Sequence, residues 1–573
     1  MSMNPPAEKK KIIPAQLPDD IYRALEHVVG REWISRDRAV LEIYSKLSLD
    51  AEGFLKKHAK NASSIPACVV LPGSTDEVRS VVRIAQRYRV PFIPFTNGQM
   101  MSAPTFPTPM ICIHLSRMNR VLAVDEQRMT ATLEPYADYG QLMAEAARVG
   151  LWNGGTPLAT TLCKLSSQVA FAGIWQTSKK YGLLDRNIVD IKLVLPTGEI
   201  MSTGSPAVAG VGRVWESGPG PDLTGVVRAS AGTTGIITEV TVKLHTWVGG
   251  ELMPEPLAGR PCIPCYADER YDHAPAPPQH RIHWIEFPDY ESEIRAYRAI
   301  AHAGIGIGLN ASGVYSSYYC SPTQALTEQR AESRFFPAYN LYVVCAGIVS
   351  EGQLEYEEKV LREIAEEQGG RFLSRDYKPE VLEALQPWNL DCIRNVCGYR
   401  MNRRMYAGGS LPAGPPEVAL YHSRLWREAL ERFGETHVTD RGGAETTPFV
   451  YGIEPAGRYT LSETDIYPDP LDPHSLEQCV AITMYSAVKN GAERHCAPFG
   501  FGGPAEPLVT FFPEQGPNVH LLLRKLRKVF DPQGRCSPGR QVLTEQELKE
   551  YPAATVEKIN GLRRMFNMKE VEP

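Results

Sequence analysis

The stretch that decides the fold runs from Gly220 to Leu244 and reads GPDLTGVVRASAGTTGIITEVTVKL. Its first part is a glycine-rich turn. Its second part is filled with β-branched residues, which predicts a largely buried β-strand. Gly232 and Gly235 carry no side chain, so the backbone there can come close to a flat or phosphorylated group. Alone this is a weak signal, and it gains weight from three other segments.

A compact βαβ-like unit occupies residues 67–95. Residues 67–71 and 90–95 are short apolar runs typical of strands. Between them, Ser74 and Glu77 predict a capping box at the start of a helix. Apolar residues at helical spacing indicate the helix itself, namely Val78, Val81, Val82 and Ala85. The second strand opens into the loop 96–101, TNGQMM.

Further elements give residues 1–248 a mixed α/β character. We expect strands at 111–115, 120–124, 129–134 and 188–195, and a helix near 139–149. Prolines crowd residues 254–278, which favours an extended connection and a domain boundary there. Beyond it, a second α+β unit is predicted, with strands near 281–286 and 340–348 and helices near 290–302, 353–368, 417–432 and 473–490. A basic amphipathic helix is expected near 519–530.

The bulk composition excludes several classes of protein. A chain of 573 residues is too long for one ordinary core, so two large units are expected. The net charge of -5 argues against a nucleic-acid surface and against a polybasic membrane anchor. No apolar run approaches the roughly 20 residues that cross a bilayer, and the polar start lacks a secretory signal. These features predict a cytoplasmic protein that is not transmembrane and binds no nucleic acid, with association to a membrane complex through a partner as the alternative.

The twelve cysteines are scattered, and only Cys262 and Cys265 have CxxC spacing. No second CxxC or histidine pair stands nearby to complete a zinc or iron–sulfur site. We therefore favour a reduced surface pair over a metal or redox site and expect no metal. Most of the other cysteines sit in apolar segments and are interpreted as small buried hydrophobic residues.

Four segments together resemble the FAD-linked oxidoreductases of the vanillyl-alcohol oxidase and p-cresol methylhydroxylase (PCMH) type. They are residues 69–98, 118–152, 188–239 and 530–540, and their combination in this order is specific. The resemblance implies an α+β fold with a two-lobed PCMH-type FAD-binding domain and an α+β cap domain for substrate. The expected divisions are an N-terminal arm and lead-in (1–60), the FAD-binding domain (61–250), the cap (251–505), and a C-terminal segment (506–573) that returns to the FAD-binding domain.

The resemblance also implies which residues hold FAD. The loop 96–101 would offer backbone N–H groups to the pyrophosphate, although an ordinary surface turn is the other interpretation. Ser166, Ser167 and Gln168 would lie along the flavin, and Ile237 near the adenine end. The full expected set is Thr96, Asn97, Gly98, Gln99, Met100, Met101, Pro135, Ser166, Ser167, Gln168, Gly232, Ile237 and Arg540. The loop holds no histidine, and Gln99, Met100 and Met101 replace small residues or tyrosine, so non-covalent FAD is favoured.

Two clusters are candidates for catalysis. Arg494 matches an arginine that would hold an anionic substrate oxygen, although its neighbour is Glu493 where the family has tyrosine. His495 is a candidate base, since imidazole titrates near neutrality. Arg494 could instead cap a helix or pair with Glu493, and a lone histidine is often structural. Tyr399 and Arg400 begin a second cluster, residues 399–404, that could grip a carboxylate or form an exposed basic turn.

The leading hypothesis is an FAD-dependent oxidase or dehydrogenase that takes a hydride from an alcohol or para-substituted phenol. Two absences weaken the phenol assignment: residues 153–168 hold no Asp or Glu, and the loop lacks its tyrosine. One alternative is a 2-hydroxy-acid dehydrogenase on the same fold, although the paired histidines of that branch are missing. The other is a non-catalytic subunit of a complex. Oxygen or a protein such as a cytochrome would accept the electrons, and we expect a homodimer.

Overall fold

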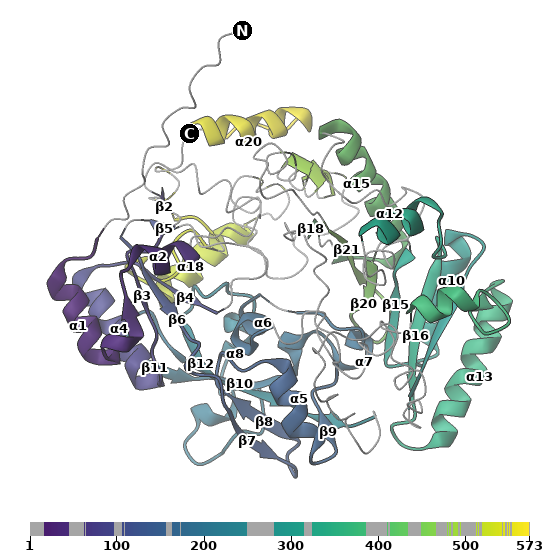
Figure 1. Ribbon diagram of the computed structural model, residues 1–573, viewed down its shortest axis with the longest axis horizontal. Helices are drawn as coiled ribbons and strands as arrows, with labels where there is room; N and C mark the ends of the chain where they lie inside the picture. Colours follow the sequence, from purple (N-terminus) through teal and green to yellow (C-terminus); the bar gives the residue numbers. More distant parts are fainter. Residues whose placement is uncertain are drawn as a thin grey trace, which may run out of the picture.

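The computed structural model is a mixed α/β protein built around three main sheets (Figure 1). The residues it describes are 16–44, 62–63, 65–96, 106–107, 109–155, 163–171, 173–248, 280–313, 324–385, 409–410, 413–433, 449–465, 478, 481–482, 485–486, 488–490, 493, 512, 514, 518–540, 542–544, 547, 549 and 553–571. Among its described helices, none is both long enough and apolar enough to span a membrane.

The first sheet has the strand order β1 (Ile34–Ser35), β3 (Cys68–Val70), β6 (Ile111–His114) and β4 (Phe92–Phe95). β3 and β4 both run parallel to β6, and β1 is antiparallel to β3. α4 (Thr75–Tyr88) connects β3 to β4 and buries Val78, Val81, Val82 and Ala85, the four residues that its helical spacing predicts. α1 (Asp19–Val29) packs on α4. The predicted βαβ unit is confirmed.

The second sheet is antiparallel and has the order β11 (Ile200–Ser202), β10 (Ile188–Val194), β12 (Ile236–Lys243), β8 (Thr130–Leu133) and β7 (Val121–Asp125). β12 is the strand expected after the glycine-rich turn, and it lies between β10 and β8 with most of its residues buried. α5 (Tyr139–Ala147) and α6 (Leu165–Phe171) contribute to the apolar core on one face of this sheet.

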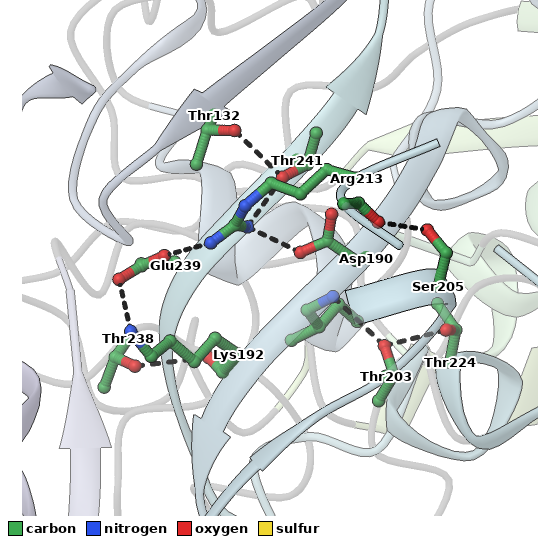
Figure 2. Close-up of polar contacts among 12 residues, drawn as sticks. Thr132, Asp190, Lys192, Thr203, Ser205, Arg213, Thr224, Thr238, Glu239 and Thr241 are labelled. Atoms are coloured by element: carbon green, nitrogen blue, oxygen red, sulfur yellow. Dashed lines mark hydrogen bonds and ion pairs between the residues drawn. The ribbon is translucent and has the colours of Figure 1, made fainter. Parts of the chain in front are cut away.

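The opposite face of the second sheet is polar and holds an ion-pair network (Figure 2). Arg213 donates to Asp190 Oδ1 at 2.6 Å and to Glu239 Oε2 at 2.5 Å. Burial raises the pKa of the Asp190 carboxyl, and the neighbouring Arg213 opposes that change. Ser205 Oγ accepts hydrogen bonds from the main-chain N–H groups of Val214 and Trp215. These contacts fasten the connection 203–222 over the sheet.

The third sheet belongs to the second unit and has the order β17 (Arg371–Phe372), β14 (His280–Glu286), β16 (Asn340–Ala346), β15 (Gly308–Ala311), β20 (Phe449–Gly452), β21 (Thr460–Asp465) and β18 (Gly409–Ser410). All of its pairs are antiparallel, and β19 (Ala413–Gly414) also joins β21. α10 (Tyr290–His302) and α13 (Glu351–Glu367) lie on the outer side of this sheet, away from the first two sheets (Figure 1).

The inner strand β16 of the third sheet is apolar on both faces because it is covered on both. In the central strand β16, Leu341, Val343 and Cys345 pack under α10 and α13. The alternate residues Tyr342, Val344 and Ala346 pack in one cluster with Trp152 and Trp247 of the N-terminal unit. All seven residues of β16 are buried because the strand is covered on both sides. A strand in such a position has a nearly continuous apolar sequence.

The remaining elements are short or peripheral. The small strand pairs are β2 (Ala62–Ser63) with β5 (Phe106–Pro107) and β9 (Leu151–Trp152) with β13 (His245–Thr246). The other helices are α2 (Arg38–Ile43), α7 (Ser178–Tyr181), α8 (Leu223–Val227), α12 (Gln324–Glu332), α15 (Ala419–Phe433), α18 (Val519–Phe530) and α20 (Ala553–Met565), with 3-10 turns at Arg31–Trp33, Leu184–Asn187, Ser205–Ala207 and Pro416–Val418.

The predicted capping box of α4 is only half formed. Ser74 Oγ accepts the N–H of Glu77, as expected for an N-cap. The Glu77 carboxylate, however, accepts from the N–H of Gly73, one residue earlier than predicted, and pairs with Arg117. A complete capping box occurs instead at α5, between Asp138 and Gln141. Arg117 accounts for the difference, because it offers the Glu77 carboxylate a charged partner.

Candidate functional site

The candidate site begins at the carboxyl ends of the parallel strands of the first sheet. Because β4 and β6 run the same way, Phe95 and His114 end side by side at one edge. Thr96 follows β4 directly, and its Oγ1 lies 2.6 Å from Ser167 Oγ on α6. The strand end thereby meets a helix that is 71 residues further along the chain. The rest of the expected loop, residues 97–101, lies outside the described residues.

α6 is held in this position by the segment around Pro135. The Pro135 carbonyl oxygen accepts both the main-chain N–H and the Oγ–H of Ser166, at 3.1 and 3.0 Å. Thr96, Pro135, Ser166 and Ser167, four of the residues expected to bind cofactor, are therefore brought together. Gln168 is on the same helix. Its Oε1 lies so close to Gly173 that a Cβ added to Gly173 would be 1.7 Å from this oxygen.

The glycine-rich turn lies against the same helix. Ala229 and Ala231 donate their N–H groups to the carbonyls of Val169 and Ala170 at the end of α6. Ala229, Ala231 and Gly232 all have positive φ, at 53°, 52° and 75°. For an alanine, that conformation costs roughly 1–2 kcal/mol, and such strained backbone clusters at functional sites. The turn is therefore held in an unfavourable conformation by its contacts with α6.

At Gly232 the backbone of this turn comes closest to β4 and to the C-terminal segment. A Cβ at this position would lie 3.1 Å from Pro94 Cγ and 3.3 Å from Ser537 Oγ. The Gly232 carbonyl oxygen accepts hydrogen bonds from Ser537 Oγ at 3.0 Å and from Cys536 Sγ at 3.2 Å. The absence of a side chain at Gly232 therefore lets the turn, β4 and the C-terminal segment meet.

The C-terminal segment 531–540 pairs with β4 through a single parallel bridge between Phe92 and Cys536. Ser537 donates its N–H to the Phe92 carbonyl at 2.8 Å, and Phe92 donates to the Arg535 carbonyl at 2.9 Å. Asp531 Oδ2 accepts the N–H of Cys536, which closes the turn, and burial raises the pKa of this carboxyl. Sequence positions near 90, 166, 232 and 537 thus converge at one edge of the first sheet.

The last two expected cofactor residues lie apart from this group. Ile237 is buried on β12, where it pairs with Leu193 in the apolar core of the second sheet. Arg540 is buried and follows Ser537 in the C-terminal turn, and its carbonyl accepts from Arg527. Both belong to elements that also form the candidate site.

Four aromatic residues at the same edge were missed as site residues by the sequence analysis. Tyr44 Oη lies 2.7 Å from His114 Nδ1, and the rings of Phe95 and Tyr136 pack edge-on against the His114 imidazole. Burial lowers the pKa of His114 to about 4, so the ring is neutral at pH 7. Within the part of the chain that is described, His114 Nε2 has no hydrogen-bond partner. Tyr44 carries no local motif, so only tertiary contacts reveal the pair.

A second group that the sequence analysis missed joins the two units. Lys179 of α7 is buried and donates to the carbonyls of Ile305 and Gly306, at 2.7 and 3.1 Å. Asn310 Nδ2 donates to the Gln176 carbonyl at 2.8 Å. A Cβ on Gly308 would lie only 2.4 Å from the same Gln176 oxygen. Segment 176–180 is therefore docked tightly against β15 of the third sheet.

The four residues predicted to take part in catalysis lie outside the described residues. They are Arg494, His495, Tyr399 and Arg400. Their neighbour Glu493 is described: it accepts a hydrogen bond from Tyr421, and its carboxylate lies 3.5 Å from Lys489 Nζ. Among the described side chains, no group of three or more His, Cys, Asp or Glu residues could hold a metal ion.

The described residues fit the FAD that the sequence resemblance implies. The paired hydroxyls of Thr96 and Ser167 and the buried Nε2 of His114 offer polar groups at the end of a parallel sheet. At the strained turn, Gly232 has no side chain that would keep a ligand away from its backbone. Backbone turns of this kind form concave sites for phosphate groups. The arrangement comes from several segments, as an extended dinucleotide requires.

Comparisons with known proteins agree with this geometry. Residues 66–204 match the family described as FAD binding domain. A D-lactate dehydrogenase [cytochrome] of Arabidopsis thaliana is 29% identical over 229 residues, 38% of this chain and 37% of that protein. The glycolate oxidase subunit GlcD of Bacillus subtilis is 29% identical over 182 residues, 32% of this chain and 37% of that protein. The chain thus spans little more than a third of the length of these curated relatives.

Solved structures match over nearly the whole chain. p-Cresol methylhydroxylase with substrate bound gives a TM-score of 0.69 at 16% identity, over 93% of this chain and 99% of that one. An alkyldihydroxyacetonephosphate synthase gives a TM-score of 0.58 at 16% identity, over 92% and 86%. The expected two-domain fold is confirmed. The chain carries an FAD binding domain at residues 66–204 and has the PCMH-type fold of p-cresol methylhydroxylase.

Proposed function

We propose that this protein is an FAD-dependent oxidase or dehydrogenase that removes a hydride from a C–H bond of a small organic substrate. The observation that carries the proposal is the convergence of Thr96, Ser167 and Gly232 beside β4, one of the parallel strands of the first sheet. A convergence of hydroxyl groups and side-chain-free backbone suits a dinucleotide better than it suits a purely structural joint.

The residues of this edge would hold the cofactor without a covalent bond. Thr96 and Ser167 would donate or accept hydrogen bonds through their hydroxyls, and the backbone near Gly232 would approach the phosphates. When bound, FAD supplies a two-electron acceptor for the hydride. The protein supplies position, exclusion of water and the handling of protons. His114 is neutral at pH 7. With the Tyr44 hydroxyl donating to Nδ1, Nε2 would carry the proton and would donate without adding positive charge.

An alcohol or a para-substituted phenol is the substrate class we favour. Arg494 would hold an anionic oxygen of the substrate, and His495 would accept the proton that a hydroxyl loses as the hydride leaves. Both assignments are predictions from sequence. The electrons would then pass to oxygen or to a protein acceptor such as a cytochrome. A homodimer in the cytoplasm stays a prediction as well.

A 2-hydroxy acid is the second candidate substrate, and it has specific support. Two relatives are named D-lactate dehydrogenase [cytochrome] and glycolate oxidase subunit GlcD, after 2-hydroxy acids. Such a substrate carries a carboxylate, which the arginines of residues 399–404 could bind through paired hydrogen bonds. The missing paired histidines would then require a recognition mode different from that branch of the family.

The test of the proposal is the colour and the redox chemistry of the purified protein. We expect flavin absorbance, release of free FAD on acid precipitation, and bleaching of the bound flavin by one substrate class under anaerobic conditions. Alcohols, phenols and 2-hydroxy acids would be screened in parallel. A colourless protein that does not take up added FAD would overturn the proposal and favour a non-catalytic subunit. Colour that no substrate class bleaches would leave FAD binding intact and reject the proposed substrates.

A further inference from the structure

One helix of the protein turns part of its apolar surface toward solvent. On α18, Val519, Leu521, Leu522 and Val529 are exposed, with Leu522 at 57% and Val529 at 74% of their full accessible surface. Single exposed hydrophobic residues need no explanation, but four on one short helix form a patch. We call these four residues, together with Lys525 and Lys528, the α18 face.

A buried ion pair sets the rotation of this helix. Arg527 is the one fully buried side chain of α18, and it donates to the Val542 carbonyl at 2.6 Å and to Glu547 at 3.2 Å. Glu547 also accepts the main-chain N–H of Thr544 at 2.7 Å. Removing one partner of such a pair would leave a buried charge, which is strongly unfavourable. The side of α18 that faces the protein interior therefore carries Arg527, and Val529 and Leu522 lie on the solvent side.

The charges on the α18 face are all positive. Lys525 and Lys528 are exposed between the apolar side chains, and none of the six residues is acidic. Neither lysine forms a salt bridge with any residue that the structure describes. The chain as a whole carries a net charge of -5, so this basic face is a local feature against an acidic background.

We propose that the α18 face docks on an anionic lipid bilayer surface. A helix with apolar side chains flanked by lysines lies in the membrane interface, where the apolar groups enter the acyl boundary and the lysines meet anionic headgroups. A specific protein partner would need roughly 800 Å² of surface on each side, more than a single short helix face presents. A membrane requires only the insertion of a few side chains. The helix leads directly into the segment that pairs with β4 (Figure 1), so docking would bring the first sheet close to the lipid surface.

The experiment measures partitioning of the full-length purified protein onto vesicles by co-sedimentation. We expect binding to phosphatidylcholine vesicles that contain phosphatidylglycerol, much weaker binding to pure phosphatidylcholine, and loss of binding at high salt. The double variant Lys525→Gln/Lys528→Gln should bind anionic vesicles about 25-fold more weakly, at about fivefold per lysine. The triple variant Leu521→Gln/Leu522→Gln/Val529→Gln should bind at least about tenfold more weakly.

The matched control is Tyr356→Gln/Lys359→Gln on α13, which removes one exposed aromatic residue and one exposed lysine from another helix. It should bind vesicles like the unchanged protein. All variants lie at exposed positions, so their thermal unfolding should be unchanged. The proposal is overturned if the unchanged protein does not bind anionic vesicles at low salt, or if the triple variant binds them equally well. It is also overturned if light scattering gives a dimer that only the triple variant dissociates, because a second copy would then cover the face.

Discussion

The ammonium group of Lys179 lies 2.7 Å from the carbonyl oxygen of Ile305, in the segment that leads into β15 of the third sheet, and so joins the two units. Burial lowers the pKa of this lysine to about 8, although Glu357, the largest opposing influence, favours its charged form. The joint between the two units therefore contains a cation that is held at a cost in free energy. The same segment is fixed a second time by Asn310, whose Nδ2 donates to the Gln176 carbonyl at 2.8 Å.

The stability of the protein should rise as the pH rises from about 8 to 10.5, through the titration of Lys179. In this window the unfolded chain binds the lysine proton and the folded chain does not, so higher pH favours the folded state. The difference between 10.5 and 8 corresponds to at most about 3 kcal/mol. Denaturant unfolding at several pH values should show this slope, and Lys179→Met should remove it. Lys180→Met, at the exposed neighbouring position, should keep it.

Replacing Gly232 by alanine should weaken FAD binding. The new Cβ would meet Pro94 at 3.1 Å, and a positive φ of 75° costs an alanine roughly 1–2 kcal/mol. Gly534→Ala is the matched control, because Gly534 also has a positive φ but has no atom within 4 Å of the added Cβ. Both variants should lose stability because of the positive φ, Gly232→Ala the more because of its contact with Pro94, and only Gly232→Ala should lose FAD affinity in a fluorescence titration. Equal FAD affinity in the two variants would argue against a cofactor role for the turn.

Acid should destabilise the protein through His114. Burial lowers the pKa of His114 to about 4 from 6.5, so between these values the unfolded chain binds a proton that the folded chain excludes. The contribution of neutral His114 to the free energy of unfolding is complete above pH 6.5. It is lost as the pH falls toward 4, by at most about 3 kcal/mol. His114→Gln should reduce the acid-side slope of the unfolding free energy. His302→Gln, on the exposed end of α10, should leave it unchanged.

Removing Arg213 should destabilise the second sheet (Figure 2). Asp190 would keep a buried carboxyl without its partner, which typically costs 3–5 kcal/mol for a fully buried pair. Arg213 is about one third exposed, so we expect about 2 kcal/mol for Arg213→Met. Arg128→Met, which breaks an exposed pair with Asp125, should cost little. If the two variants melt at the same temperature, the network does not fasten the 203–222 connection.

Substitution of Arg494 or Arg400 should distinguish the two substrate classes, because each class would depend on a different arginine. With a phenol or alcohol as substrate, Arg494→Ala should lower kcat/KM at least about 100-fold, the usual scale for losing one group that stabilises developing charge, and Arg400→Ala should have little effect. With a 2-hydroxy acid the order should reverse. Steady-state kinetics with flavin content as a normalisation would decide between them. If neither variant affects any substrate, both arginine assignments are wrong.

The elements with strong local patterns could be predicted from sequence. α10 and α18 have the predicted bounds, Tyr290–His302 and Val519–Phe530. For α10 the signal is local, because Asp289 caps its first turn and apolar residues recur at helical spacing. The prediction of a capping box at α4 was wrong for one of its two hydrogen bonds, because Arg117, 40 residues further along the chain, binds the Glu77 carboxylate. No local pattern reports a contact of that kind.

For the candidate site, the sequence by itself determined which segments take part: the strand end at Thr96, the serines of α6 and the turn at Gly232. Glycine, turn and strand preferences are local properties of the backbone, so they can be read in order along the chain. The tertiary structure alone decided that Tyr44 meets His114, that Lys179 joins the cap, and that Arg527 turns the apolar residues of α18 outward. These contacts link residues distant in sequence, or depend on which face of a helix is buried, and only the packed chain specifies either.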